Sequence, residues 1–147
     1  RTPMQWTDDE NAGFTDGTPW LAMNPNYRQI NVREQEARTD SVLAYYRRLV
    51  HLRKADAYRE TFTYGIFEPA YQEMADVFAY YRVSGESGQR ILVAANFGTD
   101  AVSLPLAYPC RQVLLSNLRA ESAVETACEK ANALTLESCE VAVIELG

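Results

Sequence analysis

Residues Ile91-Leu92-Val93-Ala94-Ala95 form an uninterrupted apolar run, which is typical of a central β-strand covered on both faces. We place this strand at Arg90–Phe97. A second predicted strand, Asp76–Val83, precedes it across Ser84–Gln89, a connection with two glycines that is typical of a hairpin. The two strands are therefore expected to pair antiparallel in the centre of a sheet.

Five further short strands, separated by turn residues, are predicted around this pair. They are Thr61–Phe67, Ala101–Leu106, Gln112–Leu115, Ala133–Leu136 and Val141–Leu146. Pro105 cannot donate a ladder hydrogen bond, so its strand is expected at an edge. Residues 120–130 have some helix propensity, but we predict a polar connection between strands there. About seven short strands predict a mainly β fold, an antiparallel β-sandwich of Greek-key type.

One amphipathic helix is predicted ahead of the strands, at about residues 40–54. Its apolar residues recur at helical spacing, and its basic residues gather at the C-terminal end, where cations suit the helix dipole. Thr39 or Asp40 is the predicted N-cap. The apolar face is broad for a helix of this length, so we expect it to pack against two bodies.

Residues 7–37 have no periodicity of 3.6 or 2, although aromatic residues recur in them at irregular intervals. A segment of about 30 residues without regular structure is uncommon in a compact domain, and it is usually a functional loop or a segment laid over a neighbouring body. The aromatic residues favour the second interpretation, because a solvated linker has no use for tryptophan. This long loop is therefore predicted to cover a partner surface.

The composition argues against several classes of protein. The 147 residues carry a formal net charge of −6, which argues against nucleic acid as a partner because phosphate binding requires clustered Lys and Arg. No apolar run approaches the roughly 18 residues of a membrane span. Cys110, Cys128 and Cys139 cannot all pair within the chain and lack metal-ligand spacing. We predict a cytoplasmic protein whose reduced cysteines serve as small buried side chains.

Candidate catalytic groups are few in this sequence. Asp8, Asp9 and Glu10 are adjacent acids, and paired carboxylates can supply the acid and base of glycoside hydrolysis. Adjacent acids in a turn are more often solvated, so we favour that interpretation. The sequence has no glycine-rich phosphate loop, Ser/His/Asp set or metal-ligand cluster, so neither a cofactor nor a metal is predicted.

The N-terminal motifs resemble one known family. The chain opens, without an initiator Met, on Arg1-Thr2-Pro3-Met4-Gln5-Trp6. The motifs that follow are Asn11-Ala12-Gly13-Phe14, Pro19-Trp20, Asn24-Pro25-Asn26-Tyr27, Ile30-Asn31-Val32, Asp40–Leu49 and Leu52–Lys54. Together they resemble the oligo-1,6-glucosidase and dextran glucosidase branch of the α-amylase superfamily, glycoside hydrolase family 13. A looser likeness continues through Asp76–Tyr80 and Leu92–Phe97.

The resemblance implies a particular place for this chain in a longer protein. Residues 1–57 would be the end of a (β/α)8 catalytic barrel, comprising the loop after the eighth strand and the eighth helix at about 40–54. Residues 58–147 would be the C-terminal antiparallel β-domain, often called domain C. The partner surface would then be the missing N-terminal barrel. In its absence, we expect the exposed loop and helix to fold over the β-domain or to make a homotypic contact.

The resemblance also implies roles for individual residues. Arg1 would bind substrate, because its guanidinium presents several fixed donors to the hydroxyls of the glucose at the cleavage site. Gln5 and Trp6 are expected to pack the loop. The Asp nucleophile, the Glu acid/base and a second Asp of this retaining family belong to earlier barrel strands. We therefore predict no catalytic residue in the chain and no hydrolysis by residues 1–147 alone.

Other functions share these features. Trehalose-6-phosphate hydrolase and sucrose-isomerising relatives have the same opening motif, and the residues that choose the linkage lie upstream. A different class is a free-standing carbohydrate-binding or interaction β-domain, which presents aromatic side chains for sugar stacking. Tyr71, Tyr80 and Tyr81 are its candidates, although strand tyrosines are more often half-buried packing residues.

Overall fold

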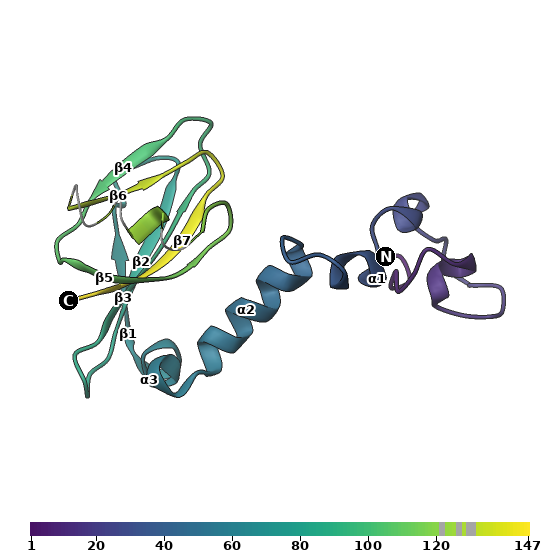
Figure 1. Cartoon of the computed structure of the whole chain (residues 1–147), viewed down its shortest axis with the longest axis horizontal. Helices are drawn as coiled ribbons and strands as arrows, with labels where there is room; N and C mark the ends of the chain where they lie inside the picture. Colours follow the sequence, from purple (N-terminus) through teal and green to yellow (C-terminus); the bar gives the residue numbers. More distant parts are fainter. Residues whose placement is uncertain (121–122, 126–127, 129–131) are drawn as a thin grey trace. The chain divides into compact units, whose positions relative to one another are not determined.

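The strand β3 (Arg90–Asn96) lies in the middle of a five-stranded antiparallel sheet in the computed structural model (Figure 1). The structure describes residues 1–120, 123–125, 128 and 132–147. The strand order is β1-β2-β3-β7-β5. The other strands of this sheet are β1 (Ile66–Ala70), β2 (Val77–Val83), β5 (Cys110–Ser116) and β7 (Val141–Leu146). The predicted central strand is confirmed, with Ile91 and Leu92 both fully buried.

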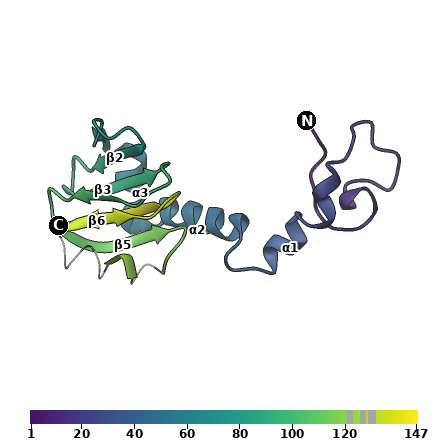
Figure 2. The same ribbon diagram turned by 90° about the horizontal axis from the view of Figure 1, so that it is seen from above.

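A second, two-stranded sheet faces the first across the apolar core (Figures 1 and 2). It pairs β4 (Val102–Pro105) with β6 (Ala133–Leu136). Leu104 and Leu134 from this sheet and Leu92 and Ile144 from the other are fully buried in one cluster. The mainly β, antiparallel sandwich is thus confirmed, and β4 with its terminal Pro105 is an edge strand as predicted.

The pairing of non-consecutive strands gives the sheet its topology. β2 and β3 form the predicted hairpin, in which Gly88 takes a φ of 72°. β7, the last strand, then inserts between β3 and β5, so the end of the chain is held on both sides. The β5–β7 ladder has two register shifts, between Cys110 and Gln112 and between Val113 and Leu115.

A helix, α3 (Asp56–Tyr64), replaces most of the strand predicted at Thr61–Phe67. The threonine and aromatic content of this segment favours a strand, but tertiary contacts override that propensity. Arg82 of β2 donates hydrogen bonds to the carbonyls of Thr61 and Phe62 near the end of α3, at 3.4 and 3.2 Å. Gly65 follows, and a Cβ there would lie only 2.4 Å from the Thr61 carbonyl oxygen. The strand starts one residue later, at β1.

The connection between β5 and β6 differs from the predicted polar link. Residues 123–125 and 128 are helical, and Val124 and Cys128 are buried in the core cluster. The prediction is therefore wrong for these residues, because the segment contributes to the core; the remainder of the predicted link lies outside the described residues. Cys139 is exposed, so the expectation of buried cysteines holds for Cys128 but not for Cys139.

The predicted amphipathic helix is α2 (Val42–Lys54). Its N-cap is neither Thr39 nor Asp40 but Ser41, whose Oγ accepts a hydrogen bond from Ala44 N at 3.1 Å. Asp40 is instead bound to Arg38, with Nε–Oδ1 and Nη2–Oδ2 distances of 3.0 and 2.9 Å. None of the α2 residues is buried.

The long loop contains three short helical segments that its sequence pattern does not reveal. They are η1 (Glu10–Gly13), η2 (Pro25–Arg28) and α1 (Val32–Glu36). The chain divides into two compact units, which we call the N-terminal unit (Arg1–Val50) and the C-terminal unit (His51–Gly147). Among the helices that the structure describes, none has both the length and the apolar character needed to cross a bilayer.

Candidate functional site

The Arg1–Trp6 segment is fixed by the start of α1. The carbonyls of Gln5 and Trp6 each accept a backbone hydrogen bond, from Val32 N and Arg33 N, both at 3.0 Å. These two amides belong to the first turn of α1, where a helix leaves its N–H groups without internal partners. Asn31, the N-cap, satisfies a third such amide by accepting from Glu34 N at 2.9 Å. The segment and α1 therefore stabilise each other.

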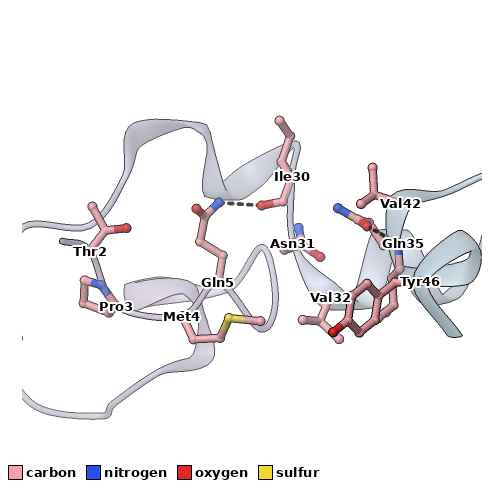
Figure 3. Close-up of a pocket in the computed structure, with 11 residues that line it drawn as sticks. Thr2, Pro3, Met4, Gln5, Ile30, Asn31, Val32, Gln35, Val42 and Tyr46 are labelled. Atoms are coloured by element: carbon pink, nitrogen blue, oxygen red, sulfur yellow. Dashed lines mark hydrogen bonds between the residues drawn. The ribbon is translucent and has the colours of Figure 1, made fainter. Parts of the chain in front are cut away.

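The side chain of Gln5 ties the same segment to η2. Its amide nitrogen donates to the carbonyl of Ile30 (Figure 3) and also to Asn26 Oδ1, at 3.1 Å for the second bond. Asn31 is buried and donates to the Tyr27 carbonyl at 2.9 Å. Both hydrogen-bond donors of the Gln5 amide thus bind other residues of the loop, in line with the packing role predicted for this residue.

A left-handed turn supports the other side of the segment. Asn11, Ala12 and Gly13 have φ values of 52°, 55° and 63°, a region that residues with a Cβ rarely occupy. The Ala12 carbonyl accepts hydrogen bonds from Trp6 N and Thr7 N at 2.9 and 3.0 Å. A Cβ on Gly13 would lie 2.5 Å from Thr7 Oγ1. The Asn-Ala-Gly motif therefore holds Trp6 and Thr7 through a strained backbone.

The acidic residues near this turn are held by an arginine. Arg33 Nη1 lies 2.7 Å from Asp8 Oδ1, and Arg33 Nη2 lies 2.7 Å from Asp9 Oδ2. The hydrogen bond from Arg33 lowers the pKa of Asp9. A general acid for glycoside hydrolysis needs a raised pKa and a second carboxylate placed across the substrate. Asp8 and Asp9 thus anchor the loop through ion pairs with Arg33, whereas the sequence predicted solvated acids.

Arg1 is exposed at the start of this anchored segment. Among the described residues, no acceptor takes a hydrogen bond from its guanidinium. The chemistry open to Arg1 is donation to neutral or anionic oxygen atoms outside this unit.

An apolar groove of about 530 Å³ runs beside the segment within the N-terminal unit (Figure 3). Its lining includes Pro3, Met4, Ile30, Val32, Val42 and Tyr46. Several large apolar side chains of this unit are exposed, the most extreme being Trp20 at 88%. An apolar lining of this kind suits contact with another protein surface more than contact with sugar hydroxyls.

The three tyrosines considered for sugar stacking lie in different environments. Tyr71 and Tyr81 pack against the core, and the Tyr71 hydroxyl donates to the Pro105 carbonyl at 2.7 Å. Burial is the main cause that raises the pKa of Tyr71. Tyr80 instead contacts the rings of Phe67 and Phe78, whose centroids lie 4.9 and 5.7 Å away. Only Tyr80 of the three thus belongs to an outer aromatic cluster.

The sequence reasoning missed the partners of Tyr80. Phe78, Tyr80 and Arg82 alternate along β2, and this period of two places them on one face, opposite Ala79 and Tyr81. A groove of about 480 Å³ lies over this face, and Arg53, Phe62 and Thr63 complete its lining together with Phe67. The alternation in the sequence was the available signal. In the part of the chain that the structure describes, no cluster of three metal-ligating side chains is present.

The comparisons with known proteins match this architecture. The family model described as "Alpha amylase, catalytic domain" matches residues 1–65. A solved isomaltulose synthase from Klebsiella sp. LX3 is similar in structure, with a TM-score of 0.82 and 33% sequence identity. The match covers 99% of this chain and 25% of the synthase chain. The chain belongs to the alpha-amylase family. The structural match extends through the β-domain, which identifies the C-terminal unit as the β-domain of that fold.

Two curated relatives are similar to this alpha-amylase family member over most of its length. An oligo-1,6-glucosidase from Parageobacillus thermoglucosidasius is 38% identical over 129 residues, which are 85% of this chain and 22% of the relative. A trehalose-6-phosphate hydrolase from Bacillus subtilis is 39% identical over 102 residues, which are 69% of this chain and 17% of the relative. The chain thus spans about a fifth of the length of these relatives.

Proposed function

We propose that this chain is the C-terminal part of a retaining α-glucosidase that hydrolyses short α-1,6-linked glucosides. The observation that carries the proposal is the match of residues 1–65 to the catalytic domain of alpha-amylases. Similarity to an oligo-1,6-glucosidase over 85% of the chain supports the choice of linkage. The substrate class is thus isomaltooligosaccharides and dextran ends, and the parent protein is proposed to act in the cytoplasm.

In this proposal, residues 1–57 complete the catalytic barrel and residues 58–147 form the supporting β-domain. The apolar groove of the N-terminal unit and its exposed Trp20 support a barrel contact, since such a surface is rarely left open to solvent. α3 (Asp56–Tyr64) continues across the proposed boundary, so this boundary falls inside a helix. In the absence of a barrel, a homotypic contact through the loop and α2 remains part of the proposal.

Arg1 is proposed to bind the glucose unit at the cleavage site. The loop framework supports this role, because Gln5 and Trp6 are fixed to α1 while the Arg1 guanidinium is exposed. A planar guanidinium can donate to two adjacent hydroxyl oxygens at once, which a lysine ammonium does less well. Arg1 would therefore orient the sugar, while the nucleophile and the acid come from upstream barrel strands.

The chain by itself is proposed to be inactive. Retaining hydrolysis needs two carboxyl groups about 5–5.5 Å apart, one ionised and one protonated. The adjacent acids of this chain, Asp8 and Asp9, are both bound to Arg33, and the pKa of Asp9 is lowered rather than raised. The purified 147-residue chain should therefore leave isomaltose and an aryl α-glucoside unchanged, and measurable turnover would overturn this part of the proposal.

The test uses the full-length protein that contains this chain. Arg1→Ala should lower kcat/KM for isomaltose by about 100-fold or more, because hydrogen bonds from a charged donor to the sugar are lost. Arg1→Lys should recover only part of this loss. Arg59→Ala is the matched control, since Arg59 is an exposed α3 residue whose contact with Asp56 is 3.9 Å long. Equal activity of the Arg1→Ala and Arg59→Ala proteins would exclude the role of Arg1.

Three other functions have observations in their favour. Similarity to a trehalose-6-phosphate hydrolase and to a solved isomaltulose synthase makes those reactions the alternatives for the full-length protein. Assaying it on isomaltose, trehalose 6-phosphate and sucrose would separate the three. A carbohydrate-binding β-domain is the alternative from another class, and Tyr80 with Phe67 and Phe78 would be its stacking surface. Saturable binding of isomaltooligosaccharides by the chain, lost in Tyr80→Ala, would favour it.

A further inference from the structure

A groove on one face of the β-domain brings two arginines together. We call it the outer groove; its volume is about 480 Å³, and it is lined by Arg53, Phe62, Thr63, Phe67, Phe78, Tyr80 and Arg82. All of these residues belong to the C-terminal unit. Arg53 Nη1, near the end of α2, and Arg82 Nη2, in β2, both donate to the Phe62 carbonyl, at 3.4 and 3.2 Å. Two guanidinium groups from separate elements therefore meet at one oxygen atom.

The outer groove holds these two positive charges without a counter-charge. None of the described residues that line it is acidic, although the chain carries 20 Asp and Glu residues and a net charge of −6. Within the described ranges, no carboxylate forms an ion pair with Arg53 or Arg82. Like charges at close range repel each other, and an anion placed between them offsets the repulsion. The groove is therefore complementary to a negatively charged ligand.

Both arginines keep hydrogen-bond donors for such a ligand. Arg82 donates from Nε and Nη2 to the carbonyls of Thr61 and Phe62, which fixes its guanidinium at the end of α3. Its Nη1 and the Nη2 of exposed Arg53 have no partner in the part of the chain that the structure describes. Thr63, also exposed, adds a hydroxyl group. Guanidinium groups are the donors best suited to phosphate and carboxylate oxygens, so this donor set fits an oxyanion.

Aromatic side chains form the rest of the groove wall. Phe67 and Phe78 are 49% and 55% exposed, so a ligand can reach their apolar surfaces. Their ring planes are tilted from that of Tyr80 by 33° and 62°. A flat base stacks best between parallel rings, and neither ring lies parallel to Tyr80. A puckered sugar ring, which has apolar C–H groups beside its hydroxyls, suits this wall better.

We propose that the outer groove binds the phosphate monoester of a small sugar. At pH 7 a phosphate monoester carries a charge of about −1.5 to −2 and three acceptor oxygens, which match two guanidinium groups better than a carboxylate does. Arg53 and Arg82 bind the phosphate, Phe78 and Tyr80 contact the sugar ring, and Thr63 offers its hydroxyl. The groove volume lies within the range of about 300–1,000 Å³ that is usual for small-molecule sites. Binding requires no glycosidase activity and is independent of the proposed function.

The test titrates the 147-residue chain with glucose 6-phosphate by isothermal titration calorimetry at low ionic strength. Saturable binding is expected, and it should weaken at about 0.15 M salt, where charges are screened beyond about 8 Å. Glucose should bind at least about tenfold more weakly, because it lacks the charge-assisted hydrogen bonds of the phosphate. Glucose or isomaltose binding as tightly as glucose 6-phosphate would overturn the proposal and favour a neutral carbohydrate ligand. Tighter binding of adenosine monophosphate would overturn the choice of a sugar.

Variants test the two parts of the outer groove separately. Arg53→Ala removes an exposed side chain and should weaken glucose 6-phosphate binding by about tenfold or more. Arg59→Ala is the matched control, because Arg59 is an exposed arginine outside the groove, and it should leave the affinity unchanged. Phe78→Ala should weaken the binding of glucose 6-phosphate but not that of inorganic phosphate. Equal affinities of the Arg53→Ala and Arg59→Ala proteins, or no saturable binding by the unchanged chain, would overturn the proposal.

Discussion

The two units of this chain are stabilised in different ways. The C-terminal unit has a core of large apolar side chains, such as Leu92, Leu134 and Ile144, drawn from both sheets. In the N-terminal unit the buried residues are small or polar, namely Pro3, Ala12, Asn31 and Ser41. Hydrogen bonds at caps and turns join its segments instead. Hydrophobic stabilisation scales with buried apolar area, so burial within the unit contributes far less to the N-terminal unit than to the C-terminal unit.

The largest effect should come from breaking the buried ion pair of the C-terminal unit. Glu140 is fully buried and accepts from Arg119 Nε and Nη2 at 2.8 and 2.7 Å, and from Ser116 Oγ at 2.9 Å. Arg119→Ala leaves this carboxylate buried without its cation, so the free energy of unfolding should fall by about 3–5 kcal/mol. Urea denaturation followed by far-UV circular dichroism measures the loss.

The control for this change is Arg111→Ala. Arg111 is exposed and lies 3.8 Å from Glu145 Oε1, so its removal should lower the free energy of unfolding by less than about 1 kcal/mol. Equal losses in the two variants would contradict the view that burial makes the Arg119 pair important.

A core truncation in the same unit should rank next. Leu134 in β6 is fully buried between the two sheets, so Leu134→Ala should lower the free energy of unfolding by about 2–5 kcal/mol through lost contacts and a cavity. Leu118→Ala is the matched change at a 55% exposed position and should have little effect. If the two variants unfold at the same urea concentration, the sheets do not share the core described above.

A smaller effect is expected in the N-terminal unit, at its left-handed turn. Gly13→Ala places a Cβ at a φ of 63° and against Thr7 Oγ1, which should destabilise the turn by about 1–3 kcal/mol. Both tryptophans of the chain, Trp6 and Trp20, lie in this unit, so their fluorescence during denaturation reports it selectively. Gly17→Ala is the control, because a Cβ there meets Thr15 Oγ1 at an ordinary 3.7 Å.

The smallest effect concerns the exposed arginine contact of the N-terminal unit. The hydrogen bond from Arg33 lowers the pKa of Asp9, so it stabilises the folded unit at pH values above 3.8, the ordinary pKa of this carboxyl group. This stabilisation is lost as the pH falls through the lower pKa of the folded state. In Arg33→Ala the pKa of Asp9 should rise toward 3.8, as followed by NMR titration of its carboxyl group. Arg38→Ala should instead raise the pKa of Asp40 and leave Asp9 unchanged.

The strands of the β-domain could be predicted from sequence because their side chains alternate or form an uninterrupted apolar run. This signal located β2, β3 and β7 nearly to their ends. The helix α3 could not be predicted, because its Thr and aromatic residues favour a strand and the contacts from Arg82 to its carbonyls are made across 20 residues or more of sequence. Tertiary contacts of that kind leave no local pattern.

The candidate site was predictable only in part. The opening motif marked Arg1–Trp6, but the network that fixes it consists of single hydrogen bonds between segments about 25 residues apart, such as Gln5 to Ile30 and Arg33 to Asp8. The cap of α2 shows the same limit. Thr39, Asp40 and Ser41 are all suitable cap residues, and only the geometry selects Ser41.

The edges of the five-stranded sheet bear on how this protein behaves at high concentration. Unpaired strand edges invite the strands of other molecules and so promote aggregation. Here β1 carries Pro69, which offers no N–H for such pairing, and β5 carries two register shifts that bend it away from a regular ladder. The sheet therefore resists growth by strand addition at both ends, independently of what covers its faces.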